Sequence, residues 1–343
     1  MLLTPQNLNI FFTGLETRFS QAYDATPVVA DKISTTFPVG TEAWISGWMG
    51  MVDKMREWVG PRITRQPGPQ TYLVPIQNFE LTQSIDQFKL QDDTYGIYNP
   101  TITNMGVQAR KWPDYQLRDL LQNQGSQVGS RQLTLDGLTH FNTAHPISYW
   151  DASRGTFPND YTGGGVVING QTVGGQLSVT AFATVWQDMA RRKTESGEPW
   201  GIVPNLAMSG TMMKLAFDVI LQSQFMGSTQ FQQLGGGANP GPNAPFFGST
   251  STVTNAYADY LMFPELGGPQ AVGGTTMDNV WYLMDTKKTI KPLSWLLRQA
   301  PDFTYRNNPQ DPVVFDTHTF QLGSVARGAP AWGFPHFISR SSA

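Results

Sequence analysis

The sequence predicts a fold of mixed α and β structure, and three features support this prediction. Two strand-like runs flank a long excursion near residues 41–86 and indicate an extended hairpin. One long amphipathic helix follows it, over residues 96–124. Strand and helix patterns then alternate through the middle of the chain, which is therefore α+β or α/β.

The composition limits the classes of protein that this chain can be. Its 343 residues (38.0 kDa) allow one large or two ordinary domains. Charged residues make up 14%, well below the roughly 25% of ordinary soluble domains, while aromatic residues reach 12%. Such a chain either buries much of its surface against partners or is a moderately soluble monomer. The net charge of −3 argues against a strongly basic nucleic-acid binder.

Several kinds of site and segment are not expected. The absence of cysteine excludes disulfides, thiolate metal sites and thiol nucleophiles. No apolar run of 18 residues is present, so no membrane contact is expected, and the start of the chain lacks a secretory-signal pattern.

Residues 1–40 carry little regular pattern, and three prolines interrupt them: Pro5, Pro27 and Pro38. We expect an extended or loosely helical arm that leans on another surface; the alternative is a disordered tail.

The hairpin follows, with strands expected at residues 41–48, 72–76 and 79–85. Its tip, residues 53–65, has a net charge of +2, whereas residues 80–93 have a net charge of −3. Opposite charges on two parts of one chain suit contact between copies. The alternative interpretation is two solvated surface patches.

The long helix is predicted by an apolar stripe at spacings of three and four residues: Tyr98, Ile102, Met105, Ala109 and Trp112. The stripe slips by one position after Pro113, which predicts a kink or break there. Gly125 is expected to end the helix.

The remaining elements are assigned from shorter patterns. Asn169-Gly170 predicts a two-residue hairpin turn, and residues 178–193 read as an amphipathic helix. A strand is expected at 202–208, and Ser209 is expected to cap a second helix. Residues 234–249 read as an exposed loop and residues 280–284 as a central strand. Residues 293–297 likewise read as a central strand, and a strand at 317–326 is expected to return to the first half of the fold.

No catalytic, metal or cofactor set emerges from the motifs. His140 and His145 lack the i, i+4 spacing of a helical metal pair. No phosphate-binding loop or nucleophile elbow is present. Asp92-Asp93 are neighbours in sequence and poorly placed for glycoside hydrolysis; a weak cation contact is the alternative. The basic runs 191–193 and 287–291 read as a helix end and a solvated loop, or as weak phosphate contacts.

A series of short motifs matches, in order and spacing, a known family over residues 44–330. They are Trp48, Glu57-Trp58-Val59-Gly60-Pro61-Arg62, Phe79-Glu80, Asp92-Asp93-Thr94-Tyr95-Gly96-Ile97-Tyr98-Asn99-Pro100, Met105-Gly106, Pro113-Asp114, Leu120-Leu121, Gly125, Asp136-Gly137, Phe141, His145-Pro146, Gly201-Ile202-Val203-Pro204, Ile290-Lys291-Pro292 and Ala326-Arg327-Gly328. The chain resembles the major head (capsid) subunit family of Mu-like tailed bacteriophages. It departs from the family pattern at His140-Phe141, Gln91 and Ala207–Gly210, and so resembles a divergent member.

The resemblance implies the α+β Hong Kong 97-type capsid fold. Carried onto this chain, it implies an N-terminal arm (1–40) and an extended loop (41–86). A peripheral domain with a spine helix (87–132), an axial domain (133–290) and a return to the peripheral domain (291–343) would follow.

The function implied is that of a major capsid protein, not an enzyme. Copies would assemble, as hexamers and pentamers, into an icosahedral shell around double-stranded DNA. Portal, scaffold and cement proteins would be partners, and the DNA contact would be weak and non-specific. The protein would be located in the virion capsid, which would assemble in the bacterial cytoplasm. The alternatives are another virion protein (tail or decoration), or a hydrolase that uses His140 or His145 with an aspartate.

On this interpretation, the hairpin tip reaches a neighbouring copy. We expect contact through Lys54, Arg56, Trp58, Arg62 and Arg65. Trp58 would be the buried anchor, because aromatic and arginine residues dominate interface energies. The acidic partners expected on the neighbour are Asp86, Asp92 and Asp93.

Overall fold

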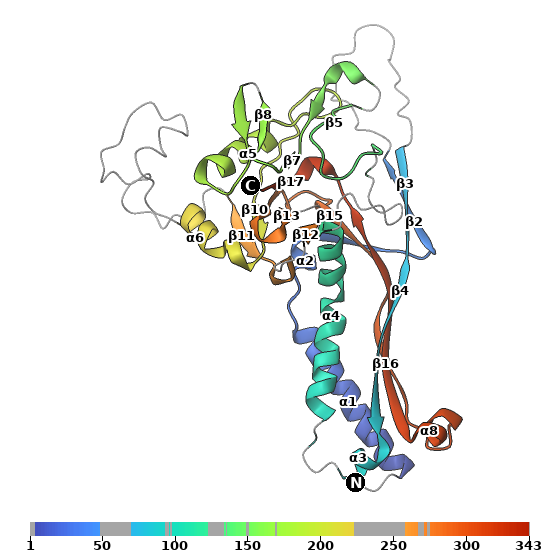
Figure 1. Ribbon diagram of the computed structural model, residues 1–343. Helices are drawn as coiled ribbons and strands as arrows, with labels where there is room; N and C mark the ends of the chain where they lie inside the picture. Colours follow the sequence, from blue (N-terminus) through green and yellow to red (C-terminus); the bar gives the residue numbers. More distant parts are fainter. Residues whose placement is uncertain are drawn as a thin grey trace.

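A computed structural model describes residues 4–48, 70–92, 96, 98–122, 134, 136–148, 151–168, 170–222, 258–266, 271–272 and 275–342. Two sheets organise these residues. The first has four strands in the order β1-β15-β16-β4, and the second has five in the order β11-β10-β14-β17-β7. Figure 1 shows the four-stranded sheet and two long helices forming an elongated domain, with the five-stranded sheet in a broader domain at one end of it.

The elongated domain is built on a ribbon of two long antiparallel strands, β15 (Leu293–Arg306) and β16 (Thr319–Trp332). β1 (Ser34–Pro38) adds in parallel to β15, and β4 (Gln77–Asp86) adds antiparallel to β16. The strand predicted near residues 317–326 therefore returns to the first half of the fold, as expected, and Phe320 and Leu322 are fully buried.

Helices α1 (Pro5–Ala25) and α4 (Tyr98–Gln122) pack together along this sheet (Figure 1). The apolar stripe of α4 contributes Ile102, Met105 and Ala109 to a core shared with α1. At Gly106 the two helices are so close that a Cβ would lie 2.5 Å from the Phe19 carbonyl oxygen. Only glycine fits at this crossing.

The arm expected to be extended or loosely helical over residues 1–40 is more regular than predicted, because residues 5–25 form the continuous helix α1. Thr4 accepts a hydrogen bond from the Asn7 amide, and Pro5 stands at the first turn, where it needs no donor. Leu8, Phe12, Leu15 and Phe19 then recur at helical spacing and are buried in the same chain. The isolated prolines obscured this stripe.

Of the kink or break predicted at Pro113, the break is wrong, because α4 continues to Gln122. Leu117, Leu120 and Leu121 beyond it are buried against β10, β11 and β14 residues of the broad domain. The slip in the stripe thus marks a change of packing partner along one helix.

The hairpin consists of β2 (Ala43–Trp48) and β3 (Gln70–Pro75), paired antiparallel. The segment that connects these strands lies outside the described residues. The third expected strand, β4, does not belong to the hairpin: Gln77 to Asp86 pair with Gly328 to Thr319 of β16. The alternation of apolar and polar residues predicts a strand but not its partner. Pairing with the distant strand β16 decides which sheet β4 joins.

The sheet of the broad domain contains β7 (Asp160–Tyr161), β10 (Leu206–Ser209), β11 (Asp259–Met262), β14 (Trp281–Met284) and β17 (Ile338–Ser341). All four residues of β14 are buried and it lies in the middle, which confirms the predicted central strand. β17 pairs with β14, so the last strand of the chain lies in this sheet and not in the elongated domain.

Two helix predictions in the broad domain have opposite outcomes. α5 (Val179–Arg191) begins at Ser178, whose hydroxyl accepts from the Ala181 amide, as the pattern predicted. Ser209 does not cap a helix: it ends β10, and its hydroxyl donates to the Gly210 carbonyl. A 3-10 turn (Thr211–Met213) intervenes before α6 (Lys214–Gln222).

Shorter helices, strands and turns connect the elements above. Ile168 and Gln171 pair across the turn at Asn169-Gly170, which confirms that hairpin, although Asn169 itself is outside the described residues. The other short elements are α2 (Ala30–Ile33), α3 (Gln87–Gln91), α8 (Pro312–Thr317), β5 (His145–Pro146), β6 (Thr156–Phe157), β8 (Val166–Ile168), β9 (Gln171–Val173), β12 (Ala271–Val272), β13 (Thr275–Thr276) and 3-10 turns at Ala152–Arg154, Pro264–Leu266, Met277–Asn279 and Pro335–Phe337. Among the described helices, none has the length and apolar character needed to cross a membrane.

Candidate assembly surfaces

Most of the predicted contact residues lie outside the described residues: Lys54, Arg56, Trp58, Arg62, Arg65 and Asp93. Asp86 and Asp92 are described, and they flank the short helix α3. The Asp86 carboxylate accepts from the amides of Phe88 (2.9 Å) and Lys89 (3.1 Å), so it caps this helix. Asp92 follows the last turn of α3 and is exposed.

An exposed apolar surface lies beside this helix, and the motif search missed it. Phe88 of α3 is 58% exposed, and Phe315 of α8 is 70% exposed. The Phe88 ring lies 5.4 Å from that of His318, which ends α8 in a left-handed conformation. We call Phe88, Val313 and Phe315 the tip patch, because α3 and α8 lie together at the end of the elongated domain farthest from the five-stranded sheet (Figure 1). The exposed aromatic side chains of Phe88 and Phe315 make this end of the elongated domain a candidate contact surface.

The base of the hairpin is fixed to the body of the protein. The Trp44 ring lies 5.7 Å from Phe37 of β1 and 6.0 Å from Tyr72 of β3. The Tyr72 hydroxyl donates to the Trp332 carbonyl at the end of β16, and burial raises the pKa of this hydroxyl. The outward face instead presents Ile45 and Leu73, which are 65% and 46% exposed. The hairpin is therefore held at its base and offers apolar side chains to solvent.

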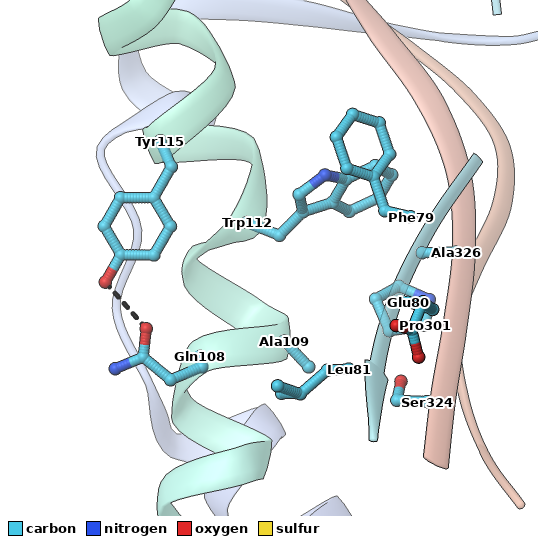
Figure 2. Close-up of a pocket in the computed structure, with 10 residues that line it drawn as sticks. All are labelled: Phe79, Glu80, Leu81, Gln108, Ala109, Trp112, Tyr115, Pro301, Ser324 and Ala326. Carbon is cyan, nitrogen blue, oxygen red and sulfur yellow. Dashed lines mark hydrogen bonds between the residues drawn. The ribbon is translucent and has the colours of Figure 1, made fainter. Parts of the chain in front are cut away.

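A pocket of about 200 Å³ opens between α4 and the strands β4, β15 and β16 (Figure 2). Its polar side chains are few, and the Tyr115 hydroxyl donates to Gln108 Oε1 (2.9 Å) at the edge. The Trp112 ring closes one side, 5.1 Å from Phe79 and 4.8 Å from Trp295. The lining residues are Phe79, Glu80, Leu81, Gln108, Ala109, Trp112, Tyr115, Pro301, Ser324 and Ala326. This chemistry suits an apolar group and carries no nucleophile–base pair.

The hydrolase alternative turns on His140 and His145, and both are buried on one loop. His145 Nδ1 contacts Asp136 Oδ2 at 2.5 Å, and its Nε2 contacts the His140 carbonyl at 3.0 Å. Burial acts to raise the pKa of Asp136, but the hydrogen bond and charge of His145 hold it below its usual value. Because both nitrogens of His145 are engaged and the pair is 1% exposed, it cannot reach a substrate.

The basic run 191–193 lies at the end of α5, as predicted, and Arg191 and Lys193 are exposed, but Arg192 is not solvated. Arg192 is 3% exposed, and its guanidinium donates to the carbonyls of His336 (2.6 Å) and Pro158 (2.9 Å) and to Ser339 Oγ (2.6 Å). Its role is to join three chain segments. Among the described residues, no group of three or more His, Asp or Glu side chains is placed to hold a metal ion.

The sequence profile of the family described as "Mu-like prophage major head subunit gpT" matches residues 8–172 and 268–343, well over half of the chain. The chain belongs to this family. This agrees with the motif resemblance, and the head-subunit match includes the hairpin, α4 and the strands β15 to β17.

Two sequence relatives support the same family. The chain is 29% identical over 147 residues to the "Major capsid protein" of Escherichia phage Mu, covering 43% of this chain and 47% of the relative. It is 23% identical over 145 residues to the "Mu-like prophage FluMu major head subunit" of Haemophilus influenzae, covering 42% and 46%. The chain spans about half the length of the curated relatives it matches.

Solved structures establish the fold of this head-subunit chain. The procapsid of bacteriophage JBD30 aligns with a TM-score of 0.53 and 21% identity, over 99% of this chain and 76% of that one. The mature capsid of bacteriophage PhiM1 aligns with a TM-score of 0.53 and 10% identity, over 92% and 87%. The expected Hong Kong 97-type α+β capsid fold is thus confirmed.

Proposed function

We propose that this chain is the major capsid protein of a tailed bacteriophage and self-assembles into the icosahedral shell that encloses double-stranded DNA. The observation that carries the proposal is the family match, joined to a capsid fold whose hairpin and tip patch expose apolar residues to solvent. Hexamers and pentamers of the chain would form the shell, with portal, scaffold and cement proteins as partners. Many modest contacts per copy would together hold it.

The proposed contact joins the hairpin of one copy to α3 of its neighbour. The hairpin tip carries Lys54, Arg56, Trp58, Arg62 and Arg65, with a net charge of +2 over residues 53–65. The acidic residues proposed to meet the hairpin tip are Asp86, Asp92 and Asp93. Their negative charge complements the positive charge of the hairpin tip, and exposed Phe88 offers an apolar surface for Trp58. Asp92 is exposed at the end of α3, which makes it a candidate for an arginine partner.

The proposed role is structural, and assembly would take place in the bacterial cytoplasm. The buried His145–Asp136 pair supports this role, because it holds two parts of one loop together and leaves no nitrogen of His145 for proton transfer. Packaged DNA would be contacted weakly and without sequence preference.

The test combines size-exclusion chromatography with negative-stain electron microscopy of the full chain. Shells, hexamers or pentamers are expected from the unmodified protein. Trp58→Ala and Arg62→Glu should reduce particle yield at least tenfold and leave the subunit folded by circular dichroism. Trp58→Phe and Arg62→Lys are the matched controls and should retain most of the yield. Asp92→Arg should restore assembly to Arg62→Glu if the two side chains pair.

Two results would contradict the proposal. A 38.0 kDa monomer at every concentration, with or without crowding agents, would contradict self-assembly. Unchanged particle yield from both Trp58→Ala and Arg62→Glu would contradict the hairpin contact and leave self-assembly intact.

A further inference from the structure

Three of the four histidines are buried together where the two domains meet. His140, His145 and His336 are each at most 5% exposed. The His140 ring stacks on Trp332, with centroids 4.1 Å apart and the planes only 7° from parallel. The His336 ring lies between Phe157 (4.2 Å) and Trp200 (4.4 Å). Both rings therefore sit among aromatic faces.

The ring nitrogens of His140 and His336 have no hydrogen-bond partner within the described part of the chain. A neutral imidazole already loses hydrogen bonds in such a position, but a protonated one must place two donors and a charge there. His145 differs, because Asp136 and the His140 carbonyl engage both of its nitrogens. The surroundings of the His140 and His336 rings therefore favour their neutral form.

The charged groups around these rings also oppose a second proton. The buried Arg192 guanidinium donates to the His336 carbonyl, while its own carboxylate neighbour, Asp188, is 3.9 Å away. On the other side, Arg340 lies 5.1 Å over the ring of Phe141, next to His140, and pairs with Asp160.

The balance of these groups disfavours the protonated rings. Burial lowers the pKa of His140 and of His336 well below the usual value. For His140 the charges of His145 and Arg340 act in the same direction, and for His336 those of Arg192 and His145 do so. Asp136 acts in the opposite direction on both but is already bound to His145.

These rings support the connection between the two domains and the hairpin. Trp332, the stacking partner of His140, is the last residue of β16, and its carbonyl accepts the hydrogen bond of Tyr72 from the hairpin strand β3. His336 lies in the turn that leads from β16 to β17 of the five-stranded sheet. Figure 1 shows this red segment passing from the elongated domain into the broad domain.

We propose that His140 and His336 form an acid-sensitive joint, whose protonation in acid separates Trp332 from its support and frees the base of the hairpin. The proposal concerns the folded chain itself and does not depend on the proposed function. The fold accepts these rings only in the neutral form, whereas the opened chain can protonate them. Their contribution to the stability of the closed joint is therefore complete above about pH 6.5 and falls as the pH drops. Each histidine weakens the closed joint by up to about tenfold per pH unit in this window.

The experiment follows hydrogen exchange of the full chain at residues 70–74, together with near-ultraviolet circular dichroism, from pH 7.5 to 5.0. After correction for intrinsic exchange, protection of these amides should fall at least tenfold by pH 5.0, with loss of the tryptophan signal. The double variant His140→Phe, His336→Phe keeps two aromatic rings without a titrating group. It should show neither change. His318→Asn is the matched control, since His318 is exposed and asparagine tolerates its left-handed backbone.

Three results would contradict the proposed acid-sensitive joint. The double variant could lose protection in acid as the unmodified protein does, or the unmodified protein could keep full protection at pH 5.0. The third is the titration of the His140 and His336 ring protons, followed by NMR, near pH 6.5 in a protein with intact tertiary signals. This last measurement uses the unmodified chain and decides the question even if the double variant does not fold. Most carboxylates titrate below this window and do not confuse the result.

Discussion

The carboxylate of Asp114, in the middle of α4, accepts a hydrogen bond of 2.7 Å from the backbone amide of Ala30. Its second oxygen accepts another, of 3.1 Å, from the amide of Val29. Asp114 is 2% exposed and directly follows Pro113. An anion is favourable at the amino end of a helix, here α2, where amides lack partners. Asp114 therefore fixes the segment that enters β1 against the long helix.

Asp114→Ala is expected to reduce the free energy of unfolding by about 3 kcal/mol, because two buried amides lose a charged acceptor. Asp114→Asn keeps one carbonyl oxygen and should lose about half as much. Asp119→Ala is the control on the same helix, since Asp119 is 44% exposed and pairs only with Arg118 among the described residues; it should change stability by less than about 0.5 kcal/mol. Urea denaturation measures all three. A value for Asp114→Ala as small as that of Asp119→Ala would contradict the clamp.

Trp112 makes a second test of how α4 is held on the sheet. Its ring packs edge-on against Trp295 and beside Phe79, and it forms one wall of the pocket in Figure 2. Trp112→Ala should cost about 3–5 kcal/mol, because the pocket becomes a larger void. Trp112→Phe should cost less than half of that, since within the described residues the indole nitrogen has no hydrogen-bond partner to lose. Equal losses for the two variants, measured by thermal unfolding, would show that the ring contacts are not the source of stability.

Local patterns predicted the elements that local interactions determine. The spacing of Ile102, Met105 and Ala109 predicted the buried face of α4, and the apolar run before Asp285 predicted the central strand β14. The same rules failed where distant residues decide. Proline alone predicts a break in α4, but it says nothing of the bond from Asp114 to an amide 84 residues away.

The candidate surfaces show the same division. Charge patterns predicted a basic hairpin tip and an acidic region near α3, but a pattern cannot tell whether an apolar side chain is covered. Phe88 and Phe315 become visible as a surface only when α3 and α8 meet at the end of the elongated domain. Likewise, His140 and His336 are far apart in the sequence, and their shared burial follows from the path of β16 and β17.

Arg192 should tolerate no substitution, even by lysine. Its two terminal nitrogens reach the carbonyls of His336 and Pro158 and the hydroxyl of Ser339 at once. A lysine ammonium cannot span these acceptors, so Arg192→Lys should lower the free energy of unfolding by about 3 kcal/mol. The neighbouring Arg191→Lys is the matched control, because Arg191 is exposed, and it should be neutral. If both variants unfold at the same urea concentration, the guanidinium does not join these segments.

The buried carboxylate of Asp136 should give a second loss of folding stability, at a lower pH than the loss expected from the histidine joint. The hydrogen bond and charge of His145 hold the pKa of Asp136 below its usual value despite burial, with help from Thr134 and the Leu138 amide. A lowered carboxyl pKa stabilises the fold above about pH 4, and this stabilisation is lost as the pH falls through the folded-state pKa. Asp136→Asn should therefore cost about 3 kcal/mol at pH 7, since it leaves His145 without its buried partner, but much less at pH 3. Asp316→Asn, at an exposed position, should follow the unmodified protein at both pH values. Urea denaturation between pH 7 and pH 3 measures the difference, and an equal cost of Asp136→Asn at the two ends would mean that the pair acts by packing and not by charge.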